Sequence, residues 1–264
     1  MCEPDAQLLI HRDGHVAEIV FNNPARLNAM TLAMWQGLYD HLADFADDDD
    51  IRVVMLSGAG DRSFVSGADI SEFDTQRGSD AAVAHYNKVS EAAEQAVADF
   101  PKPIIAAIGG YCLGGGVGIA IGCDMRIASA AASFAIPAGR LGLGYAYDGV
   151  AKLIDTIGPA ATSELFLTGA RIDASEALRI GLVNTVVPKD AFRAKSVELA
   201  STIAAHAPLT FRTFKAALIE HRKDPQQRNT ARIAEMVAQC YASKDYAEGR
   251  AAFAEKRSPR FRGS

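Results

Sequence analysis

Two glycine-rich segments carry the residues best placed to do chemistry. They are residues 63–70 (SFVSGADI) and 109–117 (GGYCLGGGV). Each follows an apolar run typical of a buried strand, and each precedes a helical pattern. A turn from a strand into a helix presents backbone N–H groups that have no partner inside the helix. Two such groups converging on one oxygen would form an oxyanion hole, which stabilises an enolate or tetrahedral intermediate by about 2.7–4 kcal/mol per donor.

The glycines also have a purely structural interpretation, because a tight turn or a close backbone approach requires the same residue. For a single glycine cluster that interpretation prevails. A nucleotide-binding loop is a further alternative, but residues 109–117 match neither GxxxxGK[ST] nor GxGxxG with a downstream acid. The residues alone therefore leave structural turns and an oxyanion hole open.

Alternating strands and helices would position these turns. We expect strands at residues 8–12, 15–21, 53–56, 104–108 and 125–128. We expect helices at 32–45 with Thr31 as cap, at 81–100, and from 117 to 121. Asp13-Gly14 is typical of a hairpin turn, while 57–69 and 109–116 are expected as a loop and a turn. The alternation predicts an α/β fold with crossover connections.

The character of the chain changes near residue 190. Amphipathic helices are expected at residues 191–205, 209–222, 231–241 and 246–257. We therefore divide the chain into an α/β core, residues 1–190, and a helical region, residues 191–264. Apolar stripes on these helices predict a closed oligomer that covers them.

Composition narrows the class of protein. The chain has 264 residues and a formal net charge of −5, which disfavours nucleic acid or an anionic membrane as the main partner. Its four cysteines, at positions 2, 112, 123 and 240, show no CxxC spacing, so we expect reduced thiols, a cytoplasmic location and no metal site. Residues 1–7 lack the pattern of a signal peptide. The uncharged stretch 103–123 is interrupted by glycines and is interpreted as a strand, a turn and a helix.

Six segments together resemble the crotonase family, the enoyl-CoA hydratase/isomerase superfamily. They are residues 23–30 (NPARLNAM), 64–70 (FVSGADI), 101–108 (PKPIIAAI), 110–116 (GYCLGGG), 177–183 (ALRIGLV) and 253–257 (FAEKR). The resemblance implies an α/β fold, a ββα spiral core followed by a C-terminal helical trimerisation region, assembled as a homotrimer or hexamer. It also implies an acyl-CoA substrate whose thioester carbonyl lies between the N–H groups of Ala68 and Gly115. No cofactor is implied beyond the CoA moiety of the substrate.

The resemblance also identifies two departures from the family pattern. Hydratases of the family use two glutamates, whose positions here fall on Gly118 and Ala138. Neither residue can exchange a proton, whereas hydration needs a base for water and an acid for the α-carbon. The hydratase reaction itself is therefore in doubt, although the scaffold and the oxyanion hole match.

Other residues remain as candidates near the reacting centre. Tyr145 falls on an active-site tyrosine of a family decarboxylase, although the histidine which that enzyme has at the position of Ala68 is absent here. Asp148 lies two residues from a working aspartate of other members. The structural interpretation of Tyr145 and Tyr147 is that of two aromatic residues that close a pocket. Arg140 is either a ligand for a substrate carboxylate or a solvent-exposed side chain.

For CoA itself, the candidates come from several segments. Arg26 and Lys102 are candidates for the phosphate groups. The family pattern adds Ala68, Asp69 and Ile70, and it adds Phe253 and Lys256 from a neighbouring subunit, although Lys256 also fits a solvated basic tail.

Three functions remain in view. The first is an enzyme that processes CoA thioesters through an enolate. Alternatives are an acyl-CoA decarboxylase-like enzyme using Tyr145, or a non-catalytic acyl-CoA-binding protein. RNA binding, which one family branch shows, is disfavoured by the net charge of −5.

Overall fold

The computed structural model describes residues 7–69 and 79–264. The chain begins with an antiparallel hairpin of β1 (Leu8–Asp13) and β2 (Val16–Phe21). Gly14 at the turn has φ of 55°, the left-handed conformation that an Asp-Gly hairpin needs. The hairpin expected from the sequence is thereby confirmed.

Two sheets build the core. The larger has six strands in the order β1-β2-β3-β5-β7-β10, adding β3 (Val53–Gly58), β5 (Ile104–Ile108), β7 (Met125–Ser129) and β10 (Thr185–Val187). The smaller has the order β4-β6-β8-β9, formed by β4 (Ser63–Val65), β6 (Tyr111–Leu113), β8 (Ser133–Ala135) and β9 (Ile172–Asp173). Strands β3 to β8 alternate between the two sheets. Each pair of consecutive strands therefore adds one strand to the larger sheet and one to the smaller sheet.

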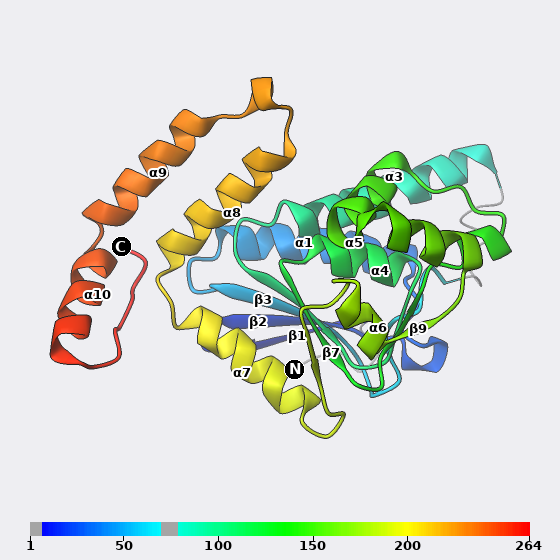
Figure 1. Ribbon diagram of the computed structural model, residues 1–264, viewed down its shortest axis with the longest axis horizontal. Coiled ribbons are helices and arrows are strands. Elements are labelled where there is room, and N and C mark those ends of the chain that lie inside the picture. Colours follow the sequence, from blue (N-terminus) through cyan, green and yellow to red (C-terminus); the bar gives the residue numbers. More distant parts are fainter. Residues whose placement is uncertain (1–6, 70–78) are drawn as a thin grey trace.

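Helices follow each pair of strands and complete the turns of a spiral. They are α3 (Asp80–Ala98), α4 (Gly115–Gly122) and α5 (Tyr147–Thr168), with α1 (Leu32–Asp47) before them and α6 (Ala174–Arg179) after them. Short 3₁₀ helices lie at η1 (Pro24–Arg26), η3 (Ala138–Arg140) and η4 (Pro225–Gln227). Figure 1 shows α1, α3, α4 and α5 together on one side of the sheets. This arrangement confirms the expected α/β spiral.

Helix α5 is bent in its middle. Gly158 has φ of 75° and ψ of 165°, which are not helical, and Pro159 follows it. A proline cannot donate the backbone hydrogen bond of a helix interior, so the bend has a local cause. The two halves of α5 therefore run in different directions.

The continuous apolar runs of the strands are explained by burial on both faces of the large sheet. Val54 and Leu56 of β3 belong to the main core under α1, α3 and α4. Val53 and Met55 belong to a second cluster on the opposite face, which includes Ala200 of α7 (Phe192–Ala204). Helix α7 is thus part of the α/β core by its packing, although it follows the boundary expected at residue 190.

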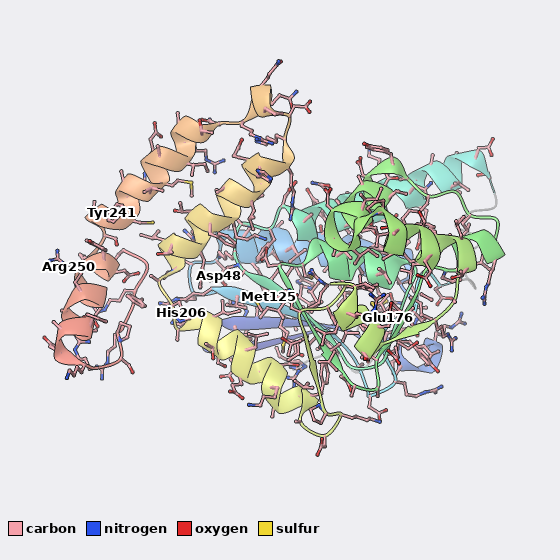
Figure 2. All side chains as sticks on the ribbon, viewed as in Figure 1. Asp48, Met125, Glu176, His206, Tyr241 and Arg250 are labelled. Carbon is pink, nitrogen blue, oxygen red and sulfur yellow. The ribbon has the colours of Figure 1, made fainter. Side chains whose placement is uncertain are left out.

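The remaining helices form an arm beside the core. It consists of α8 (Pro208–Arg222), α9 (Thr230–Ala242) and α10 (Lys244–Glu255). Helix α8 is fastened to the core by a buried ion pair between Lys215 and Asp124, whose N–O distance is 2.6 Å. Figure 1 shows α9 and α10 on the far side of α8, and Figure 2 shows Tyr241 and Arg250 on this arm, away from the sheets.

Two features are absent from the described ranges, 7–69 and 79–264. No helix in them is long and apolar enough to cross a membrane. No cluster of three or more His, Cys, Asp or Glu side chains in them is arranged to hold a metal ion.

Candidate active site

A cavity of about 1210 Å³ lies between the two glycine turns, α3 and the segment that leads into α5. The sequence-predicted residues Ala68, Gly115, Ala138, Tyr145 and Asp148 all line it. Residues from widely separated parts of the chain therefore meet at one place. The cavity is the candidate active site.

The first glycine turn directs one N–H group away from the strand bridge beside it. Met30 donates to the carbonyl of Gly67 at 2.8 Å and accepts from the N–H of Asp69 at 2.9 Å. Ala68, between them, forms a parallel bridge with Met30. In such a bridge the bonds to Met30 come from the residues on either side, so the N–H of Ala68 itself points the other way. Gly67 permits this turn with φ of 106°.

The second glycine turn provides the other N–H group. Gly114 has φ of 52°, and its N–H donates to the carbonyl of Ala135 at 2.9 Å. Gly115 is the first residue of α4, so its N–H has no carbonyl partner within the helix. A Cβ added at Gly114 would lie 3.8 Å from the Cα of Gly67. The two turns are therefore neighbours, which is the arrangement two donors need to reach one oxygen.

Close packing explains the third glycine of the GGG run. A Cβ at Gly116 would lie only 2.3 Å from the carbonyl oxygen of Val65. A Cβ at Gly115 would meet the ring of Trp35 at 3.3 Å. Trp35 is itself fixed, because its Nε1 donates to the hydroxyl of Tyr86 at 2.8 Å. The backbone of this turn is held on both sides.

Asp69 anchors the first turn. Its buried carboxylate accepts from Arg26 at 2.9 Å and from the Nδ2 of Asn23 at 3.4 Å. The side chain of Arg26 remains 52% exposed. Asp69 and Arg26, both predicted for CoA binding, are thus joined to each other. Ile70, the next predicted residue, lies outside the described residues.

The prediction for Lys102 is wrong. Its side chain is buried, and its Nζ donates to the carbonyls of Phe45 and Asp48, both at 2.6 Å. These are carbonyls at the C-terminal end of α1, which a lysine commonly caps. Burial lowers the pKa of the ammonium group. Lys102 therefore holds the end of a helix and is not available to a phosphate group.

Beside Gly118 lies a carboxyl group that the sequence analysis missed. A Cβ at Gly118 would lie 2.5 Å from Oε1 of Glu94 and 3.1 Å from its Cδ. Glu94 belongs to α3, is partly buried, and lines the cavity. Burial raises the pKa of its carboxyl group to about 7, against the opposing charge of Lys152. The space that a side chain at position 118 would take is occupied from the neighbouring helix.

A sequence signal for Glu94 existed. The buried stripe of α3 contains Tyr86, Ala93 and Val97. Glu94 lies eight positions after Tyr86 and three before Val97, which places it beside that stripe. A charged residue at such a position is a candidate for function, since charges are rarely buried without a reason.

The remaining predicted residues line other parts of the cavity. Ala138 is buried in η3. The ring of Tyr145 packs edge-on against Phe166 at 4.7 Å, and burial followed by the charge of Glu94 raises the pKa of its hydroxyl group, so it stays protonated. Asp148 is exposed in the first turn of α5. The side chain of Tyr147 is 83% exposed, which fits a residue at the rim.

Arg140 does not meet these groups. It is exposed, and its Nη2 contacts the carbonyl of Thr168 at 3.4 Å. Phe253 and Lys256 lie at the end of α10 on the arm, where Phe253 is 87% exposed and Lys256 ends the helix with φ of 54°. Figure 1 places α10 across the molecule from α3 and α5. Within the chain itself, these two residues lie apart from the cavity.

Comparison with known proteins decides the family. Residues 11–264 match the family model described as enoyl-CoA hydratase/isomerase. The chain belongs to this family. It is 34% identical to a short-chain-enoyl-CoA hydratase of Clostridium acetobutylicum, over 95% of both chains. It is 33% identical to a 2,3-dehydroadipyl-CoA hydratase of Escherichia coli, over 98% of this chain and 99% of that one.

Solved structures agree with the enoyl-CoA hydratase/isomerase assignment. An enoyl-CoA hydratase/carnithine racemase from Magnetospirillum magneticum matches with a TM-score of 0.91 and 39% identity, over 98% of this chain and 96% of that one. An enoyl-CoA hydratase from Bacillus anthracis matches with a TM-score of 0.88 and 32% identity, over 98% and 100%. The crotonase resemblance is confirmed, and this chain is a CoA-thioester enzyme of the hydratase/isomerase family.

Proposed function

We propose that this enzyme stabilises a CoA-thioester enolate between the backbone N–H groups of Ala68 and Gly115. The observation that carries the proposal is the adjacency of the two glycine turns, each of which offers one N–H group at the cavity. Such donors are fixed before the reaction, so they bind the developing oxyanion without rearrangement. Any reaction that passes through a thioester enolate is served by them.

A matched pair of variants tests the oxyanion hole. Gly115→Ala and Gly115→Pro both add a β-carbon facing Trp35, but only proline removes the N–H group. Proline is tolerated at the first position of a helix, so α4 can still form. We expect Gly115→Pro to lower kcat by about 10²–10³ relative to Gly115→Ala. Equal rates for the two variants would exclude Gly115 as a donor.

The acyl group and the reaction are tested by a substrate panel. Enoyl-, malonyl- and methylmalonyl-CoA thioesters, with products identified by mass spectrometry, separate the enzymatic alternatives. Decarboxylation with Tyr145 is the second candidate, favoured by the protonated hydroxyl group of Tyr145 at the cavity. Binding without turnover of any thioester would instead support a non-catalytic acyl-CoA-binding protein. For binding itself we expect a Kd in the micromolar range, about −8 kcal/mol, measured by calorimetry with a saturated acyl-CoA.

We also propose a homotrimer or hexamer in which the arm of one protomer approaches the cavity of another. Large apolar side chains stand exposed on the arm: Phe214, Val237, Tyr241, Tyr246 and Phe253. Exposed apolar surface of this kind favours an interface. In this assembly Phe253 and Lys256 would contact CoA bound to the neighbouring subunit. Sedimentation that shows a stable monomer at micromolar concentration would refute the assembly.

A further inference from the structure

Glu94 brings a carboxyl group to the cavity from a helix outside the glycine turns. It lies on α3, on the same helix as Tyr86, whose hydroxyl group accepts from Trp35 behind Gly115. Glu94, Ala68 and Gly115 all line the same cavity. A substrate whose thioester oxygen lies at the two turns therefore has its acyl carbons within the space that Glu94 borders.

The position of the carboxyl group is complementary to the glycine at 118. Oε1 of Glu94 lies where a Cβ at Gly118 would come within 2.5 Å, closer than any real contact of a Cβ atom. A glutamate at 118 and Glu94 in its present position exclude each other. The carboxyl group of Glu94 on α3 thus lies beside Gly118 on α4, a position that has no carboxyl group of its own.

The titratable groups that face Glu94 come from three elements. On α3 itself, the exposed Glu91 lies one turn earlier and Lys88 lies further along the rim. From α5, Lys152 faces it, but the Nζ of Lys152 donates to Oε1 of Gln95 at 3.1 Å, and Asp148 lies at the cavity rim. From the preceding segment comes the neutral hydroxyl group of Tyr145. Burial outweighs Lys152 and raises the pKa of Glu94 to about 7. Near neutral pH both forms of the carboxyl group are populated.

We propose that Glu94 is the acid–base catalytic residue of this site and that it moves one proton along the acyl chain of a 3-enoyl-CoA thioester. The inference rests on the proposed enolate chemistry and adds the group that forms and quenches the enolate. A single carboxyl group suffices for such an isomerisation, because the proton it removes is the one it returns. Hydration needs a second group to activate water.

The reaction balances without any co-reactant. The carboxylate of Glu94 removes a proton from C2, and the C–H electron pair becomes the C1–C2 double bond as the thioester carbonyl pair moves onto oxygen. The N–H groups of Ala68 and Gly115 bind that oxygen. The dienolate then collapses: the carbonyl re-forms, the double bond shifts to C2–C3, and C4 takes the proton from Glu94. The product is the conjugated 2-enoyl thioester.

The test uses 3-hexenoyl-CoA as the probe, with formation of the conjugated thioester followed by its ultraviolet absorption. Glu94→Gln keeps the size of the side chain and removes its proton transfer. We expect kcat to fall by about 10²–10⁴, with a smaller change in KM. The matched control is Glu164→Gln, an exposed carboxyl group on α5 that does not line the cavity, and we expect wild-type kinetics from it.

Two further measurements separate proton transfer from a structural role. The wild-type rate should show a limb near pH 7 that Glu94→Gln loses, since burial sets the pKa of Glu94 at about 7. The double variant Glu94→Ala with Gly118→Glu returns a carboxyl group to the same space from α4, and we expect it to regain at least about tenfold over Glu94→Ala, a fraction of the general-base contribution. A variant that merely lost packing would show neither effect.

The outcomes distinguish this inference from the proposed function. If the wild type isomerises the probe and Gly115→Pro abolishes the reaction while Glu94→Gln keeps the wild-type rate and pH profile, Glu94 is not the acid–base group and the enolate chemistry stands. If the wild type converts 3-hexenoyl-CoA no faster than Gly115→Pro does, the isomerase inference is overturned. The enolate chemistry is then decided by the wider thioester panel alone.

Discussion

Backbone groups form one side of the cavity, and side chains form the other. One side consists of backbone: the turns at Gly67 and Gly114, locked by the contacts of Gly116 with Val65 and of Gly115 with Trp35. The other side consists of side chains on α3 and on the segment before α5, among them Glu94 and Tyr145. A side chain at Gly116 would displace neighbouring backbone, whereas the side-chain side changes by single substitutions. Under the proposed function, the backbone turns that would bind the oxyanion are the fixed part of this site, and the proton-transfer group is the part that single substitutions can move.

The largest expected effect comes from rebuilding the side-chain wall. Glu94→Ala combined with Gly118→Glu and Ala138→Glu installs two carboxyl groups and clears the space at position 118. We expect crotonyl-CoA hydration to rise by about 10²–10⁴, because general acid–base catalysis contributes that much per group. A steady-state hydration assay measures the change. Wild-type protein that already hydrates crotonyl-CoA at about 10 s⁻¹, the median for enzymes, would contradict the view that Gly118 and Ala138 preclude the usual mechanism.

A second prediction contrasts two glycines that are two positions apart on α4. Gly116→Ala drives a Cβ into the carbonyl oxygen of Val65, so we expect the free energy of unfolding to fall by about 2–3 kcal/mol. Gly118→Ala meets only the flexible end of Glu94 and gains helix propensity, so stability should change by less than about 1 kcal/mol. Urea denaturation measures both. Similar losses for the two variants would show that the α4 side of the cavity is uniformly rigid.

A third prediction concerns the pH dependence of stability. The pKa of Glu94 is raised from 4.5 to about 7, so the folded state binds more protons than the unfolded state between these values. Its contribution to the free energy of unfolding therefore falls as pH rises through that window. Glu94→Gln removes the titrating group and with it this fall in the free energy of unfolding. We expect the variant to gain stability over wild type between pH 4.5 and 8, by up to about 3 kcal/mol. An unchanged difference across that range would mean that the carboxyl group titrates normally.

The smallest expected effect is at the rim. Tyr147→Phe removes a hydroxyl group from a side chain that is 83% exposed, so stability should stay within about 0.5 kcal/mol. The isomerisation rate should also stay within about twofold, a change of under 0.5 kcal/mol in the barrier. Tyr145→Phe serves as the comparison, because Tyr145 is packed against Phe166 beside Glu94. A large kinetic effect at Tyr147 would place the proton transfer at the rim.

The sequence was sufficient for the backbone side of the cavity. Both turns lie between apolar strands and helical patterns, and their glycines have few alternatives at positive φ or in close contact. Strands β3, β5 and β7 and the helices after residue 190 lie close to their expected positions. The sequence predicted a loop and a turn where the structure has strands β4 and β6. Each strand has only three residues, which is too short to show a two-residue period.

The side-chain wall left only a weak signal in the sequence, the position of Glu94 beside the buried stripe of α3. Glu94 lies within a helix of mixed composition, where a glutamate ordinarily faces solvent, and only the packing of α3 against α4 reveals its proximity to Gly118. Lys102 failed for a related reason. The sequence places Lys102 between two prolines, but the end of α1 lies over it and its carbonyls accept the hydrogen bonds of Lys102. Tertiary contacts between distant segments decide both residues.

The bend in α5 has a consequence for which acyl chains the enzyme accepts. Tyr145 and Phe166 are 21 positions apart, which a straight helix would separate by about 30 Å, yet their rings are 4.7 Å apart. The non-helical conformation of Gly158 changes the direction of α5, and Phe166 from its second half packs against the ring of Tyr145, which precedes the helix. Phe166 does not line the cavity, but its size sets how far Tyr145 can retreat from it. Substrate length can therefore be tuned by residues that no substrate ever touches.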